Sequence, residues 1–464
     1  MLFLRELKKI CFSFAYVLFL VLLIFQWFQN FYGVTEREIS AAKGKGSSIY
    51  TEIAGGSILV KPEKNAESYG SKKEEVPEKI MSGGTDSLIM EYLKNSYATY
   101  PFDYYKEVIL SEEEQDKILS ILEEITGLTE EQIHHLPDDY FPAVNGNIIH
   151  MGSTATPNAD GSFTFEAGAA SAAENTDDPA KHFVSQVSYQ RFKELMSQVE
   201  SIVGSGSNYS MDMLLEYYGQ VEMTYEEAME EYNKTIQEDQ VSTAFARLFC
   251  DYMTRALGLY PVFVVAVFWL KDRHNRMNEL IDSKQMKTKK IVFTRFIAML
   301  TAVMIPVVLL SFESLVPLLR YSFDTGIAVD VFAFIKYILW WLLPTTMIVT
   351  ALGMFLTILT STPFAILVQF VWWFVDSAMT GLSGDTKWCT LMIRHNLLNG
   401  SEIIRQNFEV ICLNRGILVL LSVFLVWLSV IVYDQKRGGR LAYEYAVHRY
   451  WRIFKNRFSA RLQK

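Results

Sequence analysis

The chain is poor in cysteine, and the four that it has are far apart. They are Cys11, Cys250, Cys389 and Cys412, so the long acidic region between the first two contains none. An external domain of about 200 residues without a disulfide is unusual among eukaryotic secreted proteins. The cysteine distribution therefore favours a bacterial envelope protein.

The chain also lacks the short motifs that mark common catalytic sites. It contains no H-E-x-x-H zinc motif, no G-x-S-x-G nucleophile motif and no paired-cysteine motif. It has no G-x-x-x-x-G-K-[ST] phosphate loop either, because the glycine-rich run at residues 44–48 lacks the upstream glycine at the required spacing. We therefore expect no catalytic residue and no ATP site in this chain.

One histidine-rich stretch raises the question of a metal site. It contains His134, His135 and His150 together with Asp138 and Asp139. Their spacing matches no standard ligand pattern. A solvated helix end and loop is the simpler interpretation, so we expect no metal.

What the chain has in abundance is long apolar runs. Half of the residues are hydrophobic, and they cluster in six stretches of about 20 residues or more. Such a stretch crosses ~30 Å of hydrocarbon as a helix, and only a helix satisfies its own backbone there. The sequence predicts an all-α polytopic membrane protein with six transmembrane helices. The predicted spans are residues 10–28, 248–270, 291–318, 331–359, 364–382 and 411–433.

The first run resembles a signal peptide, because Arg5, Lys8 and Lys9 precede a long apolar core. The core is close to span length and rich in Phe and Trp, and no small-x-small cleavage site follows it promptly. We therefore expect a retained first span.

Charge is distributed very unevenly. Residues 31–246 carry 38 acidic and 15 basic side chains, whereas the rest of the chain carries 14 acidic and 28 basic ones. Basic residues flank spans on the cytoplasmic side. They occur at Arg5, Lys8 and Lys9, in residues 271–290 and in the tail at 435–464. With six spans these three regions share one side, so both termini are predicted in the cytoplasm of a bacterial cell and residues 31–246 outside.

The predicted domain layout has four parts. Residues 1–30 hold the N-terminal segment and first span, and residues 31–246 form a mostly helical extracytoplasmic domain with flexible inserts. Residues 247–434 form a five-helix transmembrane domain with a cytoplasmic loop at 271–290, and residues 435–464 form a basic cytoplasmic tail. The tail mixes arginine with aromatics and directly follows a span, so we expect it on the lipid surface rather than on nucleic acid.

Within the external region, residues 43–86 have weak apolar periodicity and predict a partly mobile stalk. Capping boxes begin at Ser111 and Thr129, and helical patterns cover residues 182–203, 211–218 and 224–240. Residues 383–409 are too apolar for a plain loop, so short helices dipping into the outer membrane face are expected there.

The basic loop at 271–290 reads as a short amphipathic helix. Met277, Leu280 and Ile281 share one helical face, and the charged residues occupy the others. Two interpretations stay open at this point. One is a docking helix that contacts a soluble motor protein, and the other is an interfacial turn whose basic residues contact lipid phosphates.

The residues around this loop resemble those of a known family. Asp272-Arg273, Glu279-Leu280, Ser283 and Arg295 match, in this order, a pattern of the permease subunits of type-2 ATP-binding-cassette (ABC) transporters. Asn414-Arg415 at the start of the sixth span fits as well. The resemblance covers the spans and the loop, roughly half of the chain, and not residues 40–240.

The resemblance implies a permease that pairs with a second, identical or related permease and binds two cytoplasmic ABC ATPase subunits, which carry the ATP. It implies an ATPase-coupling segment made of Asp272, Arg273, Arg276, Met277, Glu279, Leu280, Ile281 and Ser283. Two rival functions remain: a mechanotransmitting, permease-like regulator of an external process, and a membrane-anchored sensor that uses residues 31–246 as its ligand domain.

Ionisable residues also occur within the predicted spans, near their outer ends. They are Asp251, Arg255, Glu313, Lys336 and Asp376. At ~1.5 Å per residue all lie within roughly 10–15 Å of the outer surface. Such residues are costly in a membrane and usually face a polar interior. They predict either a polar vestibule on a substrate exit path, or side chains that reach the headgroups or form static pairs.

Overall fold

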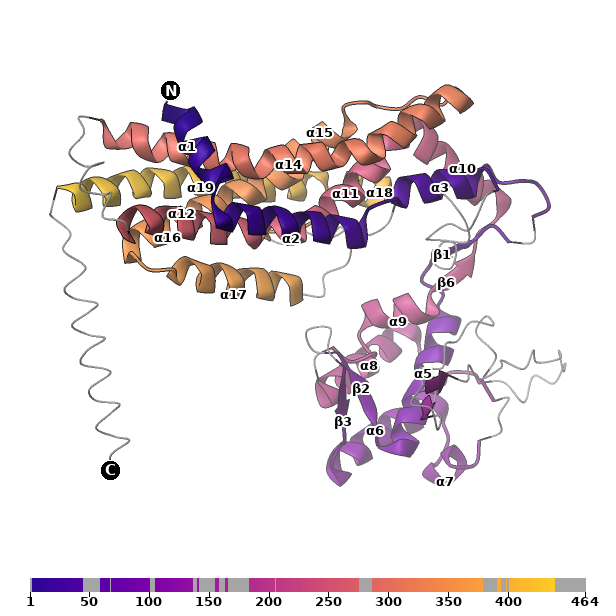
Figure 1. Cartoon of the computed structure of the whole chain (residues 1–464). Helices are drawn as coiled ribbons and strands as arrows, with labels where there is room; N and C mark the ends of the chain where they lie inside the picture. The colour runs from indigo at the N-terminus through magenta and orange to yellow at the C-terminus, as the bar shows by residue number, and fades with distance from the viewer. Residues whose placement is uncertain are drawn as a thin grey trace, which may run out of the picture. The chain divides into compact units, whose positions relative to one another are not determined.

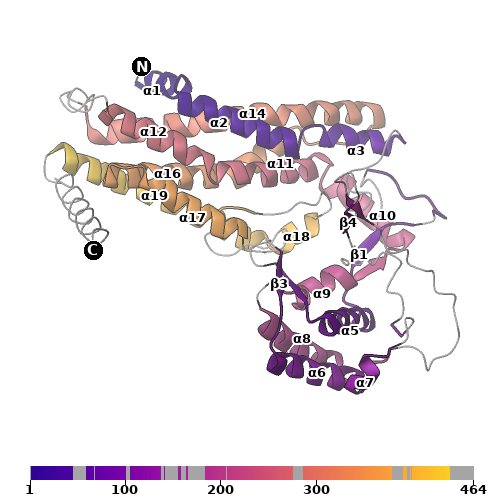
Figure 2. The same cartoon turned by 60° about the horizontal axis from the view of Figure 1, so that its bottom comes forward.

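The computed structural model describes most of the chain and is mostly helical (Figures 1 and 2). The described residues are 2–44, 59–66, 68–100, 105–136, 140–141, 155–157, 163–165, 183–204, 206–274, 286–378, 390–393, 398 and 400–438. Contacts divide the chain into two compact units. We call residues 1–66 and 225–464 the bundle unit and residues 67–224 the insert unit.

The bundle unit contains the apolar helices. Five helical stretches have the length and apolar composition of a membrane span: Phe14–Ala42, Ser242–Lys271, Thr288–Thr325, Ala333–Thr360 and Phe408–Arg437. The fifth predicted span, residues 364–382, corresponds to α17 (Phe364–Ala378), whose 15 described residues cover ~22 Å. The chain is therefore a helical membrane protein, and its described residues include five candidate spans and one shorter apolar helix.

The bundle unit takes its helices from both sides of the insert unit in the sequence. They are α1 (Leu2–Cys11), α2 (Phe14–Asn30), α3 (Val34–Ala42), α10 (Tyr225–Asn233), η3 (Lys234–Glu238), α11 (Ser242–Leu257), α12 (Tyr260–His274), α14 (Thr288–Thr325), α15 (Ala333–Tyr337), η4 (Ile338–Leu342), α16 (Leu343–Thr360), α17, α18 (Ser401–Gln406) and α19 (Phe408–Arg437). The segments η3 and η4 are π-helical.

The start of the chain differs from the predicted first span. A separate helix, α1, covers residues that the prediction assigned partly to that span, and α2 begins only at Phe14. The hydroxyl of Ser13 accepts a hydrogen bond from the backbone N–H of Tyr16 and so caps a new helix there. Because α1 is polar on one side, it packs alongside α14 instead of extending α2.

A second break separates α11 from α12. Pro261 has no backbone N–H to donate to the carbonyl of Leu257, and the N–H groups of Leu259 and Val262 bond three residues back instead of four. The carbonyls of Gly258 and Arg255 accept from side chains of α17: Gln369 donates to that of Gly258 at 2.6 Å, and Trp373 donates to that of Arg255 at 2.9 Å. These bonds anchor the short helix α17 to the bundle.

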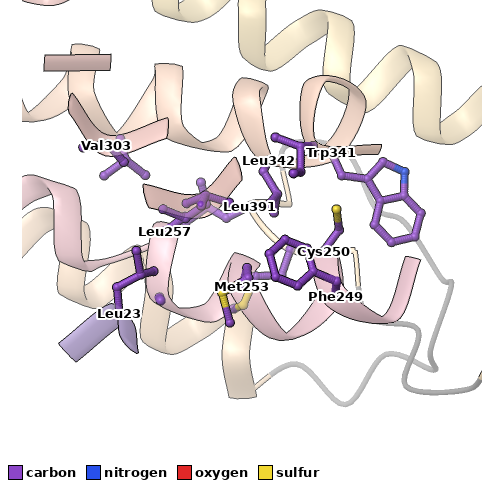
Figure 3. Close-up of a cluster of buried hydrophobic side chains, with 14 of the residues drawn as sticks. Leu23, Phe249, Cys250, Met253, Leu257, Val303, Trp341, Leu342 and Leu391 are labelled. Carbon is purple, nitrogen blue, oxygen red and sulfur yellow. The ribbon is translucent and has the colours of Figure 1, made fainter. Parts of the chain in front are cut away.

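The core of the bundle unit is a continuous apolar cluster drawn from most of its helices. Figure 3 shows one part of it, where Leu23 of α2, Phe249 and Leu257 of α11 and Trp341 of η4 lie together. Leu391 belongs to the same cluster although its segment is not helical. A non-helical segment packed among membrane helices requires internal partners for its backbone.

The insert unit has a core of its own. Its helices are α5 (Pro77–Lys94), α6 (Glu112–Thr126), α7 (Glu130–Ile133), α8 (Tyr189–Val203) and α9 (Met211–Tyr218). Three two-stranded sheets accompany them: β1 (Ser71–Lys73) with β6 (Gln220–Glu222), β2 (Tyr97–Thr99) with β3 (Lys106–Val108), and β4 (Ala155–Pro157) with β5 (Phe163–Phe165). The β1–β6 pair brings the two ends of the unit together.

Several local predictions for the insert unit are confirmed. Both capping boxes form, at Ser111 and at Thr129. The predicted helix at 211–218 has the same bounds as α9. The predicted stalk is wrong from Pro77 onward, because α5 begins there and buries Ile80 and Leu88 in the core.

Candidate coupling junction and buried polar clusters

The predicted coupling segment lies almost wholly outside the described residues. Arg276, Met277, Glu279, Leu280, Ile281 and Ser283 are among the residues that the structure does not describe, and of Asp272 and Arg273 only the helical backbone is described. What the structure describes is where the segment is rooted. The described chain reaches His274 at the end of α12 and resumes at Met286, just before α14.

The α14 root is held by a buried arginine. Arg295 is 3% exposed, and its Nε lies 3.3 Å from Oε2 of Glu6 in α1, which is also buried. Its guanidinium carbon lies 4.7 Å from the ring centroid of Trp269 and 5.3 Å from that of Phe268. The planar guanidinium therefore pairs with a carboxylate and stacks on two aromatic rings at once. Arg295 thus connects α14 with both α1 and α12.

The C-terminal end of α19 holds the same region from another side. Thr288 Oγ1 donates to Asp434 at 2.6 Å, and Arg437 donates to the carbonyl of Met286 at 2.6 Å. The rings of Trp269 and Tyr433 meet edge to face with centroids 5.8 Å apart. Lys436 of α19 donates to the carbonyls of Ile358 and Leu359 and so bonds α19 to the C-terminal end of α16.

We call these residues the loop-base junction: Glu6, Phe268, Trp269, Met286, Thr288, Arg295, Tyr433, Asp434 and Arg437. Both ends of the 271–290 segment contact other helices. On the α12 side Trp269 contacts Arg295 and Tyr433, and on the α14 side Met286 and Thr288 are hydrogen-bonded to α19. Packed helices move as rigid bodies rather than bending continuously. A force applied to the segment would therefore act on four helices together.

A second cluster surrounds Asp376, one of the predicted intramembrane charges. Its Oδ2 accepts hydrogen bonds from the backbone N–H groups of Leu391 and Met392, at 3.1 and 3.0 Å. Leu391, Met392 and Ile393 are all buried. Asp376 therefore supplies acceptors to the non-helical segment at 390–393, which a helix would have supplied through its own carbonyls.

Arg415 binds the carbonyl side of the same segment. Its guanidinium donates to the carbonyls of Thr390 at 3.0 Å and Leu391 at 3.2 Å. It also donates to the hydroxyl of Thr345 at 2.8 Å and to the carbonyl of Trp341 at 3.2 Å. Asn414 adds a hydrogen bond to the Thr390 hydroxyl at 3.2 Å. These residues form what we call the Arg415 cluster: Trp341, Thr345, Asp376, Thr390, Leu391, Met392, Asn414 and Arg415.

The helix opposite Arg415 is adapted to receive it. The π-helical turn η4 ends at Leu342, and Pro344 near the start of α16 has no N–H. Both features release backbone carbonyls from the regular helical pattern. The carbonyl of Trp341 consequently accepts from Arg415 and, at 3.3 Å, from Thr345. Arg415 is thus hydrogen-bonded both to the end of η4 and the start of α16 and to the 390–393 segment.

The other predicted intramembrane charges have different surroundings. Glu313 accepts a hydrogen bond from the backbone N–H of Gly33 at 3.1 Å. Lys336 is 66% exposed and forms an ion pair with Asp330 at 2.6 Å. Asp251 is buried, and Arg255 of the same helix is only partly buried.

Glu313, Lys336 and Asp376 therefore bind different partners among the described residues. Each of the three has a partner within the protein, and both interpretations predicted from the sequence remain predictions. The vestibule stays a prediction.

Sequence reasoning missed a buried ion pair in the bundle unit. Arg247 of α11 is 1% exposed and donates to both carboxylate oxygens of Asp239, at 2.7 and 2.6 Å. It also donates to the carbonyl of Leu398 at 3.1 Å. Asp239 follows the π-helix η3 and Arg247 lies within α11, and the turn at 239–241 separates the two, so no single helical periodicity points to this pair.

The structure describes only part of the histidine-rich stretch. His134 and His135 follow the short helix α7, and Nδ1 of His135 lies 2.8 Å from the carbonyl of Glu131. His150, Asp138 and Asp139 fall outside the described residues.

We compared the chain with known protein families, curated proteins and solved structures. No family model, curated protein or solved structure matches the chain. The resemblance to ABC permeases therefore rests on the sequence of the spans and the basic loop, and it stays a prediction.

Proposed function

We propose that the chain is the permease subunit of an ATP-driven exporter of the type-2 ABC class. In this proposal it forms the transmembrane pathway and binds, through residues 271–290, a separate ATPase subunit in the cytoplasm. A second permease, identical or related, completes the pathway. No ATP binds to this chain.

The observation that carries the proposal is the loop-base junction. A docking segment transmits work only if its roots are fixed to the parts that must move. Arg295 fixes one root to α1 and α12, and Thr288 and Met286 are fixed to α19. A simple interfacial turn would need none of these buried contacts.

The proposed mechanism uses the same contacts. Closure of two ATPase subunits on ATP would displace the docking segment. The bonded ends of α12, α14 and α19 would follow it, and Glu6 would bring α1 along. The Arg415 cluster, which ties α16, α17 and α19 to the 390–393 segment, would carry the displacement to the far part of the bundle. Coupling of this kind needs packed elements with two discrete arrangements.

The test is recovery of an ATPase with the full-length protein. A tagged chain purified in mild detergent from its own host is expected to co-purify a subunit that contains a G-x-x-x-x-G-K-[ST] sequence, identified by mass spectrometry. The double substitution Glu279→Arg and Leu280→Asp is expected to remove that subunit.

The matched control is Glu112→Arg with Leu93→Asp, which makes the same chemical changes on exposed residues of the insert unit. This control is expected to retain the ATPase. Equal recovery with both double variants would exclude residues 279–280 as the contact, and absence of any such ATPase from the unsubstituted protein would count against the function itself.

A further inference from the structure

A cavity with excess positive charge lies between α1 and the start of α14. Its volume is about 60 Å³, and its polar walls are Arg5, Glu6 and Lys9 of α1 and Arg295 of α14. Leu2 and Ile291 supply apolar walls. One water molecule needs roughly 10–15 Å³ on this measure, so the cavity has room for a group of several heavy atoms.

The charges of the cavity walls do not balance. Among the residues that line the cavity, three are cationic and one is a carboxylate: Glu6 lies 3.3 Å from Arg295 and 3.4 Å from Lys9. Arg5 makes no ion pair with any residue in the part of the chain that the structure describes. Arg5 and Lys9 are also four residues apart on one helix, and like charges at that spacing repel each other. The cavity therefore has a net positive charge that favours an anion.

The exposed face of α1, turned away from the bundle, indicates where that anion comes from. Leu4 is 66% exposed and Phe12 is 80% exposed, although both are large apolar residues. Lys8 lies over the Phe12 ring at 6.0 Å. A short helix with exposed apolar side chains beside basic ones is typical of a helix that lies in the headgroup region of a bilayer. The cavity then opens at the depth of lipid phosphates.

We propose that this cavity binds the phosphate of an anionic phospholipid headgroup. Arg5 and Lys9 donate charge-assisted hydrogen bonds to the phosphate oxygens, and Leu2 and Ile291 contact the lipid beyond it. Arg295 stays paired with Glu6 and adds its positive field from behind. The site is independent of the proposed transport function, because it needs neither an ATPase nor a substrate.

The site has a consequence for the loop-base junction. The bound phosphate would neutralise the repulsion around Glu6, whose ion pair connects α1 to α14. An anionic lipid is therefore expected to stabilise the contact between these two helices, and a neutral lipid is not.

The test uses the full-length protein purified in a neutral detergent, with thermal unfolding followed while lipid is added. Phosphatidylglycerol is expected to raise the unfolding temperature in a saturable way, whereas phosphatidylcholine and inorganic phosphate are expected to have little effect. Stabilisation by inorganic phosphate equal to that by phosphatidylglycerol would overturn the assignment to a lipid. A lack of preference for phosphatidylglycerol over phosphatidylcholine would overturn the site.

Three variants identify the residues. Arg5→Ala and Lys9→Ala are each expected to weaken phosphatidylglycerol binding by about tenfold or more, because each removes a charge-assisted hydrogen bond. Lys8→Ala is the matched control: it removes the same charge from the same helix, but Lys8 does not line the cavity. It is expected to weaken binding by no more than about fivefold, through general attraction to the anionic surface.

Arg5→Ala decides the result, because Arg5 has no ion pair in the described residues that its loss would break. An effect of Arg5→Ala no larger than that of Lys8→Ala would overturn the proposal.

Discussion

Asp376 Oδ2 lies 3.1 Å from the backbone nitrogen of Leu391, and this contact ties the end of α17 to a segment 15 residues further along the chain. The same oxygen binds the N–H of Met392, while Arg415 binds the carbonyls on the other side. A non-helical backbone within a membrane bundle persists only when its polar groups are bonded inside the protein. Asp376 and Arg415 fulfil that requirement for residues 390–393.

The first prediction concerns Asp376. Asp376→Ala leaves two buried N–H groups without their acceptor, at a cost of about 1–3 kcal/mol for each unsatisfied group. We expect a clearly lowered unfolding temperature for the purified full-length protein. Asp376→Asn keeps one acceptor oxygen and should be milder. The comparison is Lys336→Ala, which breaks an exposed ion pair worth about 1 kcal/mol or less. Equal destabilisation by Asp376→Ala and Lys336→Ala would contradict the role of Asp376.

The second prediction concerns the loop-base junction. Glu6→Ala removes the carboxylate that lies 3.3 Å from Arg295, which is buried beside the rings of Trp269 and Phe268. Breaking one side of a buried ion pair costs about 3–5 kcal/mol, whereas replacing both partners by apolar residues is often tolerated.

We therefore expect Glu6→Ala to destabilise the protein strongly, and Glu6→Leu combined with Arg295→Met to be more stable than Glu6→Ala. Thermal unfolding of all three proteins measures this order. If the double variant proves less stable than Glu6→Ala, the pair does not act as a buried ion pair.

These relationships mark the limit of what the sequence predicts. Apolar runs located the membrane helices, because a span is a local property of about 20 residues. Asp376 was recognised as an intramembrane charge, but its partners lie in a segment whose position depends on the packing of the whole bundle. Likewise, Arg295 appears in the sequence as a basic residue that begins a span. Its pairing with Glu6 depends on where α1 packs.

Two helices were missed for a different reason. The sequence of α1 merges with the apolar run that follows it, and only the Ser13 cap separates the two. The start of α5 lies in a stretch of low hydrophobicity, and its buried face includes Gly83 and Gly84, which carry no apolar signal. A Cβ at Gly83 would come within 2.2 Å of the Tyr218 ring, so close packing explains this choice of residue.

The third prediction is that the insert unit folds by itself. Residues 67–224 have a separate apolar core, and β1 pairs with β6 so that the two ends of the unit adjoin. A fragment of these residues is therefore expected to be soluble and helical, and to unfold in one cooperative transition in urea. Residues 67–224 contain no tryptophan, so tyrosine fluorescence can follow unfolding. Circular dichroism and tyrosine fluorescence should give the same midpoint urea concentration. Non-coincident transitions would show that the unit depends on the bundle.

The fourth prediction uses a buried carboxyl group of that fragment. Burial raises the pKa of Glu91, although hydrogen bonds from Tyr209 and from the N–H of Ala98 act in the opposite direction. A carboxyl whose pKa is raised by folding contributes most stability below its unfolded pKa of about 4.3, and that contribution is lost as the pH rises through the folded value.

Glu91→Gln removes this loss while keeping polar groups opposite Tyr209 and Ala98. We expect the free energy of unfolding of the unsubstituted fragment, minus that of the variant, to fall as the pH rises from about 4. Urea titrations of both proteins at several pH values measure this difference in free energy. Exposed carboxyls such as Glu114 and Glu124 are present in both proteins, so their effects cancel in the difference. A difference that stays constant or rises with pH would contradict the burial of Glu91 in the fold.

The central claim is that residues 271–290 bind a separate ATPase, and site-specific photo-crosslinking tests it most directly. A photoreactive amino acid replaces Leu280 in the full-length protein, and in a parallel protein it replaces Leu420, which is 72% exposed in the middle of α19. From position 280 we predict a crosslinked partner whose sequence contains a G-x-x-x-x-G-K-[ST] phosphate loop, and from position 420 we predict no such adduct. Crosslinking of lipid alone from position 280, or of the same ATPase equally from both positions, would contradict the account.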